Sequence, residues 1–208
     1  MGGGERAMNL PAAYGLFSQG VLVAALLCAL WPTARRGWVM LIPLNVAVIA
    51  ILVPIGGPSV AEHLRAVWGD PAVVTTLLLL VYLVAPRRLP QRPSRRVALG
   101  LGFVLPVALY SPLVLSQPLI DLYPVGWHPL GFLSPLLVIV FMLRNRIGPR
   151  WICLMAVAVL AFAGGLMESS NLWDYLVDPG LLVGLAVCSR ARSSPVSLQS
   201  VQHSPAAP

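Results

Sequence analysis

Long apolar stretches separated by short, arginine-rich loops constrain the fold of this chain more than any other feature of its sequence. The 208 residues are 58% hydrophobic and 10% charged, with a mean hydropathy of +0.82, whereas soluble domains carry roughly 25% charged residues. Several stretches approach the roughly 20 residues that a helix needs to cross about 30 Å of hydrocarbon. We therefore exclude a water-soluble fold and expect an all-α polytopic membrane protein.

Seven membrane-spanning helices are predicted, in a single bundle over residues 1–189. The expected spans are 14–31, 38–55, 72–85, 97–117, 129–143, 151–167 and 171–189. The third and fifth are only about 21 to 23 Å long at the helical rise of 1.5 Å per residue, so they either begin in the preceding loops or thin the bilayer. Residues 190–208 contain a Ser/Pro-rich stretch of little charge and are predicted to be a disordered cytoplasmic tail.

The distribution of charge predicts an orientation. The arginines on one side of the expected bundle are Arg35, Arg36, Arg87, Arg88, Arg92, Arg95, Arg96, Arg144, Arg146, Arg150, Arg190 and Arg192. The acidic residues, on the other side or in the outer half of a span, are Glu5, Glu62, Asp70, Asp121, Glu168, Asp174 and Asp178. The positive-inside rule makes the arginine side cytoplasmic, with the N-terminus outside and the C-terminus inside. The net charge of +7 therefore indicates orientation in a bacterial cytoplasmic membrane, with lipid and not nucleic acid as the partner.

Residue types that are missing or scattered exclude several kinds of chemistry. All fourteen basic residues are arginine, so neither a lysine Schiff base nor a phosphate-loop lysine is present. Paired haem ligation inside the bundle is not expected, because the histidines lie outside the spans: His63, His128 and His203. The cysteines are far apart and are interpreted as small buried hydrophobes: Cys28, Cys153 and Cys188. We predict no cofactor and no metal.

The segment from Glu168 to Gly180 carries the most informative polar pattern. Glu168, Asn171, Asp174 and Asp178 are spaced by three, three and four residues, which places them on one stripe of a helix with Tyr175 beside them. We take Asp174 and Asp178 as candidate catalytic residues. Glu168, Tyr175 and the neighbouring Trp173, which also fits a membrane-interface anchor, are candidate substrate contacts.

The depth of this stripe decides between two interpretations. If the last helix is continuous to Ser189, Asp178 lies about 16 Å above its cytoplasmic end, near the bilayer midplane. A carboxylate at that depth is a functional-site hypothesis by default. Pro179 predicts a kink or break there, whose freed carbonyls could line a pocket. The alternative is an external amphipathic segment followed by a short last helix.

Three further residues inside the expected spans are candidate substrate contacts. Asn45 lies near the middle of the second span, where an interhelical hydrogen bond is favoured over a catalytic role. Tyr82 and Tyr110 could face a substrate, although core packing is the favoured interpretation for both.

The loop 57–71 predicts a short interfacial helix. Ser59 is its expected N-cap, and Glu62 stands at the N3 position of a capping box. Glu62, His63 and Asp70 could form a metal or acid site together with Asp121 and His128, but solvated loop charge is favoured because no ligand spacing is diagnostic.

The order of these features resembles the small integral-membrane terpene cyclases of meroterpenoid and indole-terpenoid pathways. That family carries Asn-x-x-Trp-Glu on its second helix, where Asn45 stands here, and a Pro-rich exit follows, here Pro54 and Pro58. A short acidic loop and a Trp-x-x-x-Asp-like step come next, and Glu62, Trp68 and Asp70 lie in those places. An Asp before a Tyr-Pro step and a basic end mark the last helix, and Asp174, Tyr175, Asp178, Pro179, Arg190 and Arg192 look similar.

The resemblance implies a seven-helix enzyme that protonates a prenyl chain or its terminal epoxide and guides a carbocation through cyclisation. The family's Trp-Glu pair falls on Val48 and Ile49 here, so the proton must come from elsewhere. The preferred acid is Asp174, with Asp178 and Asn45 positioning or polarising it and Asp70 as a weaker candidate. The implied partner is a hydrophobic prenylated small molecule.

A second hypothesis is a small membrane transporter or assembly subunit that uses Asp174 and Asp178 as a proton or cation site. The absence of a visible internal repeat counts mildly against a transporter. A sensor whose outer acidic face binds a cation or a peptide is a third alternative. No oligomeric state is predicted.

Overall fold

The computed structural model describes residues 10–31, 39, 41–90, 100–110, 122–128, 131, 133 and 148–193. Within them the regular elements are helical, and the only strand-like feature is an isolated bridge between Pro54 and Ser59. The elements are α1 (Leu10–Leu30), α2 (Leu41–Leu52), α3 (Val60–Trp68), α4 (Val73–Val84), η3 (Pro86–Arg88), η4 (Gly100–Val104), α6 (Leu105–Tyr110), η6 (Tyr123–Trp127), α8 (Pro149–Ala163), α9 (Leu172–Leu176) and α10 (Gly180–Ser193). The predicted all-α class is confirmed for this part of the chain.

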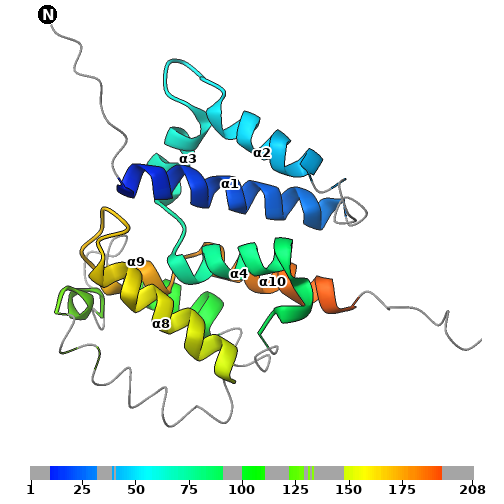
Figure 1. The fold of residues 1–208 in the computed structure, drawn as a ribbon. Coiled ribbons are helices and arrows are strands. Elements are labelled where there is room, and N and C mark those ends of the chain that lie inside the picture. The colour runs from blue at the N-terminus through cyan, green and yellow to red at the C-terminus, as the bar shows by residue number, and fades with distance from the viewer. Residues whose placement is uncertain are drawn as a thin grey trace, which may run out of the picture.

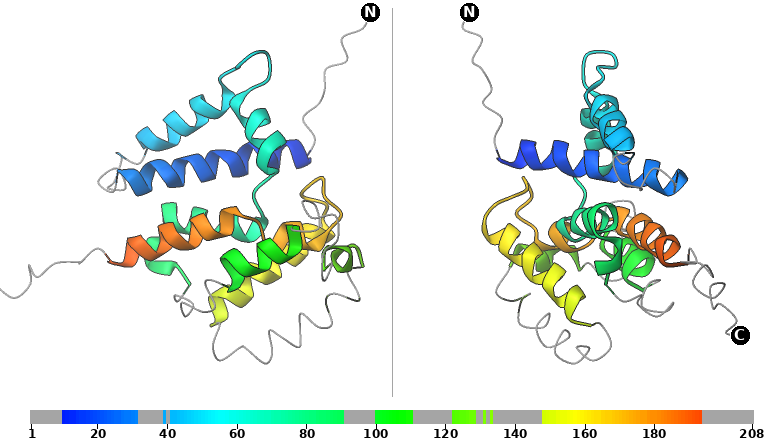
Figure 2. Two further views of the ribbon diagram at one scale, coloured as in Figure 1. Left: turned by 180° about the vertical axis from the view of Figure 1, so that it is seen from behind. Right: turned by 45° about the vertical axis from the view of Figure 1, so that its right-hand side comes forward.

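The helices form two layers around α4 (Figures 1 and 2). Helices α1 and α2 lie side by side in one layer, with α3 at one end of the pair. Beneath α1, α4 packs against α10 on one side and against α8 and α9 on the other. Helix α1 thus lies between α2 and α4 and covers one face of α4, and α8, α9 and α10 cover its other sides.

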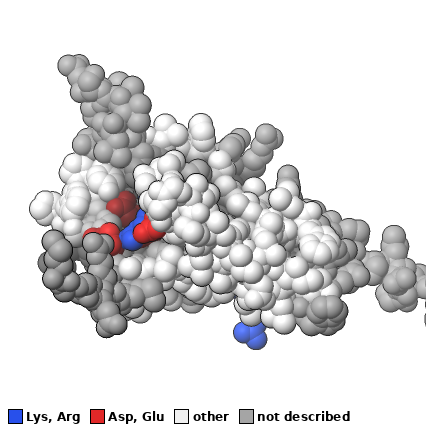
Figure 3. Space-filling view, turned by 90° about the horizontal axis from the view of Figure 1, so that it is seen from above, with Lys and Arg blue, Asp and Glu red and all other residues white. Residues whose placement is uncertain are grey.

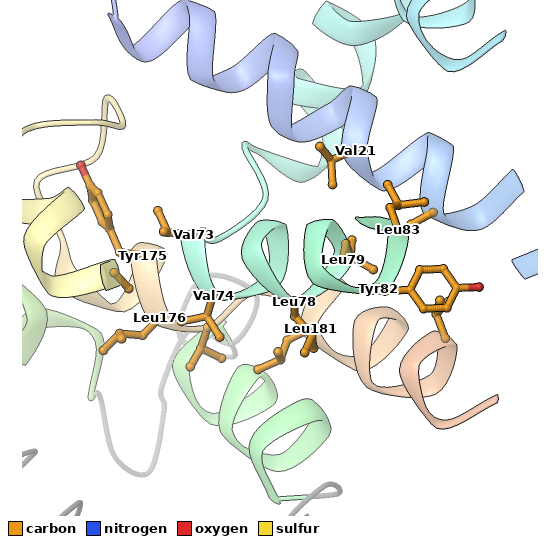
Figure 4. Packing of buried hydrophobic residues seen from close by; sticks show 14 of the residues in the cluster. Val21, Val73, Val74, Leu78, Leu79, Tyr82, Leu83, Tyr175, Leu176 and Leu181 are labelled. Carbon is orange, nitrogen blue, oxygen red and sulfur yellow. The ribbon is translucent and has the colours of Figure 1, made fainter. Parts of the chain in front are cut away.

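Helix α4 occupies the centre because it is apolar around its whole circumference, as expected of a helix that is buried on several sides. Leu78, Leu79 and Tyr82 are each at most 1% exposed. Figure 4 shows them between α1 and α10. Glycine allows α10 to approach closely, since a Cβ at Gly184 would lie 3.3 Å from Leu78 Cδ2. Tyr82 therefore packs in the core, in agreement with the favoured interpretation of this residue.

One helix among the described residues is long and apolar enough to cross a membrane. Helix α1 has 21 residues, or about 32 Å at 1.5 Å per residue. The shorter apolar helices α2, α4 and α8 have 12, 12 and 15 residues, or about 18 to 23 Å. These four helices correspond to the predicted spans 14–31, 38–55, 72–85 and 151–167. Of the predicted span 97–117, residues 100–110 are described and form η4 and α6, whereas of the predicted span 129–143 only residues 131 and 133 are described.

The short helix predicted in the loop 57–71 is present as α3, and its capping box is complete. The backbone N–H of Glu62 donates to Ser59 Oγ at 3.3 Å, and the backbone N–H of Ser59 donates to Glu62 Oε2 at 2.6 Å. These two bonds satisfy two of the donors that a helix N-terminus leaves unpaired. The prediction was correct because a capping box depends on residues three apart in sequence.

The break predicted at Pro179 is also present. Helix α9 ends at Leu176 and α10 begins at Gly180, because proline lacks an N–H and disfavours a helical conformation of the residue before it. The stripe from Glu168 to Asp178 is therefore divided between a loop, a short helix and a break. Helix α10 continues to Ser193, so the predicted tail boundary at 190 is too early, and residues 194–208 lie outside the described residues.

Candidate functional site: an acidic pocket

A cavity of about 670 Å³ lies where α3, the α3–α4 connection, η6 and the segment 167–179 meet. We call it the acidic pocket. Its lining residues are Arg65, Val67, Gly69, Asp70, Tyr123, Met167, Glu168, Ser169, Asp174, Asp178 and Pro179. Figure 3 shows acidic side chains around a basic one in a hollow of this face. All three candidate catalytic residues, Asp70, Asp174 and Asp178, line the pocket, together with the candidate substrate contact Glu168.

Asp178 is held at the base of the pocket by donors from two helices. The side chain is buried, and its Oδ2 accepts from the backbone N–H of Ala72 at 3.1 Å. Its Oδ1 accepts from Thr75 Oγ1 at 2.5 Å and from the backbone N–H of Leu181 at 2.9 Å. The carboxylate thereby lies at the N-termini of both α4 and α10, where the helix dipoles favour negative charge. Asp178 joins two helix starts and acts as a hydrogen-bond acceptor.

Asp70 has a different environment, because one of its two oxygens lacks a donor. Its side chain is 6% exposed, and Oδ2 accepts from Arg65 Nη2 at 2.9 Å. No donor among the described residues reaches the buried Oδ1, which lies against α1, where a Cβ at Gly15 would come within 2.7 Å of it. Burial raises the pKa of the Asp70 carboxyl, and the Arg65 guanidinium opposes this rise without cancelling it. The burial of Asp70 thus favours its neutral, carboxylic acid form.

Arg65 connects α3 to the far wall of the pocket. Besides Asp70, its Nη2 contacts Glu168 Oε1 at 3.1 Å. The Glu168 side chain is 61% exposed, so this second ion pair is weak, typically below about 1 kcal/mol. Arg65 therefore holds Asp70 firmly and Glu168 loosely at the mouth of the pocket.

Asp174 lies on the wall opposite α3 and is surrounded by hydroxyl groups. Tyr123 Oη donates to its Oδ2 at 3.0 Å and its Oδ1 at 3.2 Å, and Ser169 Oγ donates to Oδ2 at 2.5 Å. Burial, together with the charge of Asp174, raises the pKa of Tyr123, so its phenol keeps its proton and remains a donor. The three side chains form one hydrogen-bonded group, which we call the Asp174 triad.

The wall behind this triad is built by docking η6 onto α9. Asn171 caps α9 by accepting from the backbone N–H of Trp173 at 3.0 Å, and its Nδ2 donates to the carbonyl of Tyr123 at 3.0 Å. Trp173 Nε1 donates to the carbonyl of Leu122 at 3.0 Å. Gly126 makes the approach feasible, since a Cβ there would overlap Asn171 Oδ1. The candidate contact Trp173 therefore holds the wall of the pocket and does not line its interior.

The remaining candidates lie elsewhere. Asn45 is exposed and donates to the carbonyl of Leu41 in its own helix at 2.7 Å, and among the described residues it forms no interhelical bond. Tyr175 is buried; its hydroxyl accepts from the backbone N–H of Met167 at 2.9 Å, and its ring packs edge-on against Phe162. It supports the segment behind the pocket. The side chain of Tyr110 lies outside the described residues.

Sequence reasoning did not identify Arg65, Tyr123 and Ser169 as parts of the site. Arg65 lies in the loop 57–71, on the side of the expected bundle where the other charged residues are mostly acidic. This unusual position was the sequence signal that could have pointed to Arg65. Tyr123 is 51 residues from its partner Asp174, and no periodic pattern connects them. Ser169 stands beside the acidic stripe, outside its helical spacing.

The pocket does not form a metal centre in the described part of the chain, where no three His, Cys, Asp or Glu side chains are grouped closely enough to hold an ion. The loop site considered for Glu62 and His63 is not assembled, since His63 Nδ1 lies 2.9 Å from the carbonyl of Ser59 and Glu62 is engaged in the capping box. Of its other predicted members, Asp70 lines the acidic pocket, His128 follows η6, and Asp121 lies outside the described residues.

Comparisons with protein-family models, curated proteins and solved structures found no match for this chain.

Proposed function

We propose that this chain is an integral-membrane enzyme that cyclises a prenyl or other isoprenoid chain by acid-initiated carbocation chemistry. The observation that carries the proposal is the convergence of Asp70, from the connection before α4, with Asp174 and Asp178, from the end of the chain, in one cavity. These are the segments in which the resemblance to membrane terpene cyclases places acidic residues. The fold brings these two segments together although they are about 100 residues apart in the sequence, as the hydrogen bond between Ala72 and Asp178 shows.

Membrane insertion is supported by the apolar side chains that the helices leave uncovered. On α2, only Pro43, Ala47 and Ile51 are buried, while Leu41, Ile49 and Leu52 are each more than half exposed. Large apolar patches on a water-exposed surface would promote aggregation, whereas lipid tails accommodate them. We therefore propose that α1 and the shorter apolar helices cross a bacterial cytoplasmic membrane within a seven-span bundle, with the N-terminus outside and the C-terminus inside.

Asp70 is our preferred proton donor. Protonating an alkene or an epoxide requires a neutral carboxylic acid, and burial in an apolar site favours that form. The raised pKa and the unpaired Oδ1 of Asp70 fit this requirement. Asp178, which accepts three hydrogen bonds, fits a structural role instead. The donor assignment thus moves from Asp174, the residue favoured by the sequence, to Asp70.

The rest of the lining fits a lipid-like substrate with a polar end. Val67, Met167 and Pro179 supply apolar surface, and the ring of Tyr123 supplies an aromatic face of the kind that stabilises cations. The side chain of Val67 at the mouth is 87% exposed, which suits a substrate that enters from the membrane. We expect no cofactor in this reaction.

The excess of acidic residues favours a second candidate, proton- or cation-coupled transport. Among the described residues that line the pocket, four are acidic and Arg65 is the one basic residue. Such a lining would attract cations. Under this alternative Asp174 would be a coupling site, and its substitution would abolish pH-driven uptake of a solute.

Product analysis tests the proposal. Membranes that contain the protein are incubated with prenylated aromatic compounds and their terminal epoxides, and products are separated by chromatography and weighed by mass spectrometry. We expect a product of unchanged mass and altered retention, lost in Asp70→Asn by at least about 100-fold. Glu62→Gln is the matched control, because it also removes one carboxylate, lies outside the acidic pocket and keeps a residue that supports a capping box.

The outcomes separate the candidates. Full activity of Asp70→Asn would reject Asp70 as the donor. Absence of conversion by folded wild-type protein over the whole panel would reject the cyclase and leave the transporter, which pH-driven uptake into proteoliposomes then tests.

A further inference from the structure

The acidic pocket holds two carboxyl groups with opposite surroundings. Asp70 is enclosed by α1 and α3; its Oδ2 is paired with Arg65, and its buried Oδ1 has no donor among the described residues. Asp174 is partly exposed and accepts hydrogen bonds from Tyr123 and Ser169. Hydroxyl donors aimed at a carboxyl group stabilise its ionised form. The two walls of the pocket therefore offer different surroundings to a carboxyl group: burial beside one guanidinium for Asp70, and two hydroxyl donors for Asp174.

We propose that Asp174 is the base that ends the cyclisation, with Tyr123 and Ser169 holding its carboxylate toward the pocket. This inference rests on the proposed function. Acid-initiated cyclisation needs both kinds of group, because the proton added at the start must be matched by one removed at the end. Groups with contrasting environments are the expected acid and base of such a pair.

The proton balance assigns a step to each residue. At the start, the O–H bond of Asp70 breaks and its proton goes to the substrate; with an epoxide, a C–O bond opens and leaves a carbocation. The π electrons of the next double bond then form the new ring bond and move the positive charge along the chain. At the end, a C–H bond next to the cation breaks, its electron pair becomes a C=C bond, and Asp174 takes the proton. The product is an isomer of the substrate.

The two carboxyl groups return to their starting states without a co-reactant. After one turnover Asp70 is ionised and Asp174 is protonated, so a single proton must pass from one to the other. Glu168, whose side chain is 61% exposed, lines the same pocket, so water at the mouth can exchange protons with both groups.

The other carboxylates of the pocket fit this step less well. Both oxygens of Asp178 are engaged by Ala72, Thr75 and Leu181, and protonating the group would weaken three bonds that join α4 to α10. Glu168 is mostly exposed and paired with Arg65. Asp174 is less exposed and is held in place by the hydroxyl groups of Tyr123 and Ser169.

The nature of the product tests the inference. In Asp174→Asn the amide keeps the shape of the side chain but is a very poor base, while Asp70 can still start the reaction. We expect the cation to be captured by water, so that the main product becomes an alcohol heavier than the substrate by one water molecule. The ratio of alcohol to alkene should rise by about 100-fold over wild type. Glu62→Gln, which removes a carboxylate outside the acidic pocket, should leave the alkene as the main product.

Each result has a defined meaning. An unchanged alkene-to-alcohol ratio in Asp174→Asn overturns the inference and leaves the cyclase intact. Complete loss of conversion with retained substrate binding also overturns it, because Asp174 would then belong to the initiating step. If Asp174→Asn does not fold, Tyr123→Phe makes the same test, with a smaller rise in alcohol expected and an unchanged ratio counting against the inference. If wild-type protein converts no substrate, the proposed function itself fails.

Discussion

At the scale of single residues, the acidic side chains of this chain share a pocket but differ in what they contact. Asp178 accepts hydrogen bonds from two helix starts, Asp174 from two hydroxyl groups, and Asp70 from one guanidinium. The sequence groups Asp174 with Asp178 because they are four residues apart. Their contacts separate them, since the break at Pro179 turns Asp178 toward α4 while Asp174 stays on the short helix α9.

Removing the Asp178 carboxylate should destabilise the fold strongly. Asp178→Ala leaves the N–H of Ala72 and the hydroxyl of Thr75 without their acceptor, at about 1 kcal/mol or more for each buried donor. The N–H of Leu181 keeps the backbone carbonyl of residue 178 as an acceptor. We expect a loss of about 2 kcal/mol or more and a lower unfolding temperature in nanodiscs. Thr75→Val, which removes one donor, should cost about 1 kcal/mol. Equal effects of the two variants would contradict a shared network.

Asp70 should make stability depend on pH with a definite sign. Its pKa in the fold is above the ordinary value of 3.8, so its contribution is fully present below about pH 4 and is lost as pH rises through the folded pKa. Relative to Asp70→Asn, wild type should therefore lose stability as pH rises above about pH 4. Unfolding temperatures of both proteins at a series of pH values from about 4 upward provide the measurement.

Glu62 provides a control of opposite sign. Bonds from the Ser59 backbone and hydroxyl lower the pKa of Glu62 from its ordinary value of 4.5, so its contribution is present above that value and is lost as pH falls through the folded pKa. Relative to Glu62→Gln, wild type should gain stability as pH rises. If stability relative to the matched variant changed with pH in the same direction for Asp70 and for Glu62, the net charge of the protein, and not the surroundings of each carboxyl group, would determine the pH dependence.

At the scale of elements, the sequence predicted those features that depend on contacts between residues close together in the chain. The capping box of α3 and the break before α10 depend on residues within four positions of each other, and both were predicted correctly. The docking of η6 onto α9 joins residues about 50 positions apart. No spacing rule reaches that far, so the wall of the pocket and the partners of Asp174 were not predicted.

A single methyl group should disrupt that wall. In Gly126→Ala the new Cβ overlaps Asn171 Oδ1 and approaches Trp173, so η6 must move away from α9 at a cost of about 1 to 3 kcal/mol. Hydrogen exchange should rise at the backbone N–H of Trp173 and at neighbouring amides. Gly131→Ala is the matched control, because no atom lies within 4 Å of a Cβ at that position. Equal exchange in the two variants would show that η6 does not depend on this contact.

At the scale of the whole molecule, composition predicted the helical class but not the lengths of the helices. The apolar stretches became helices, yet α2 and α4 stop at 12 residues, where Val53 and Pro54 lead into a turn and Ala85 and Pro86 end the helical hydrogen-bond pattern. Hydropathy counts apolar residues without regard to such helix ends. The outward side chains of α2 therefore test the membrane proposal better than helix length does.

Residue 49 on α2 should contact lipid tails. The side chain of Ile49 is 64% exposed, and a nitroxide label at Ile49→Cys, with Cys28, Cys153 and Cys188 replaced, should be reached readily by dissolved oxygen and poorly by a polar nickel complex. A label at Glu62→Cys, on the exposed face of α3, should show the opposite preference, because we expect α3 to lie at the membrane surface. Power-saturation measurements in nanodiscs compare the two sites. If nickel reached both labels equally, α2 would face water, and a seven-span bundle with a membrane-embedded pocket would have to be abandoned.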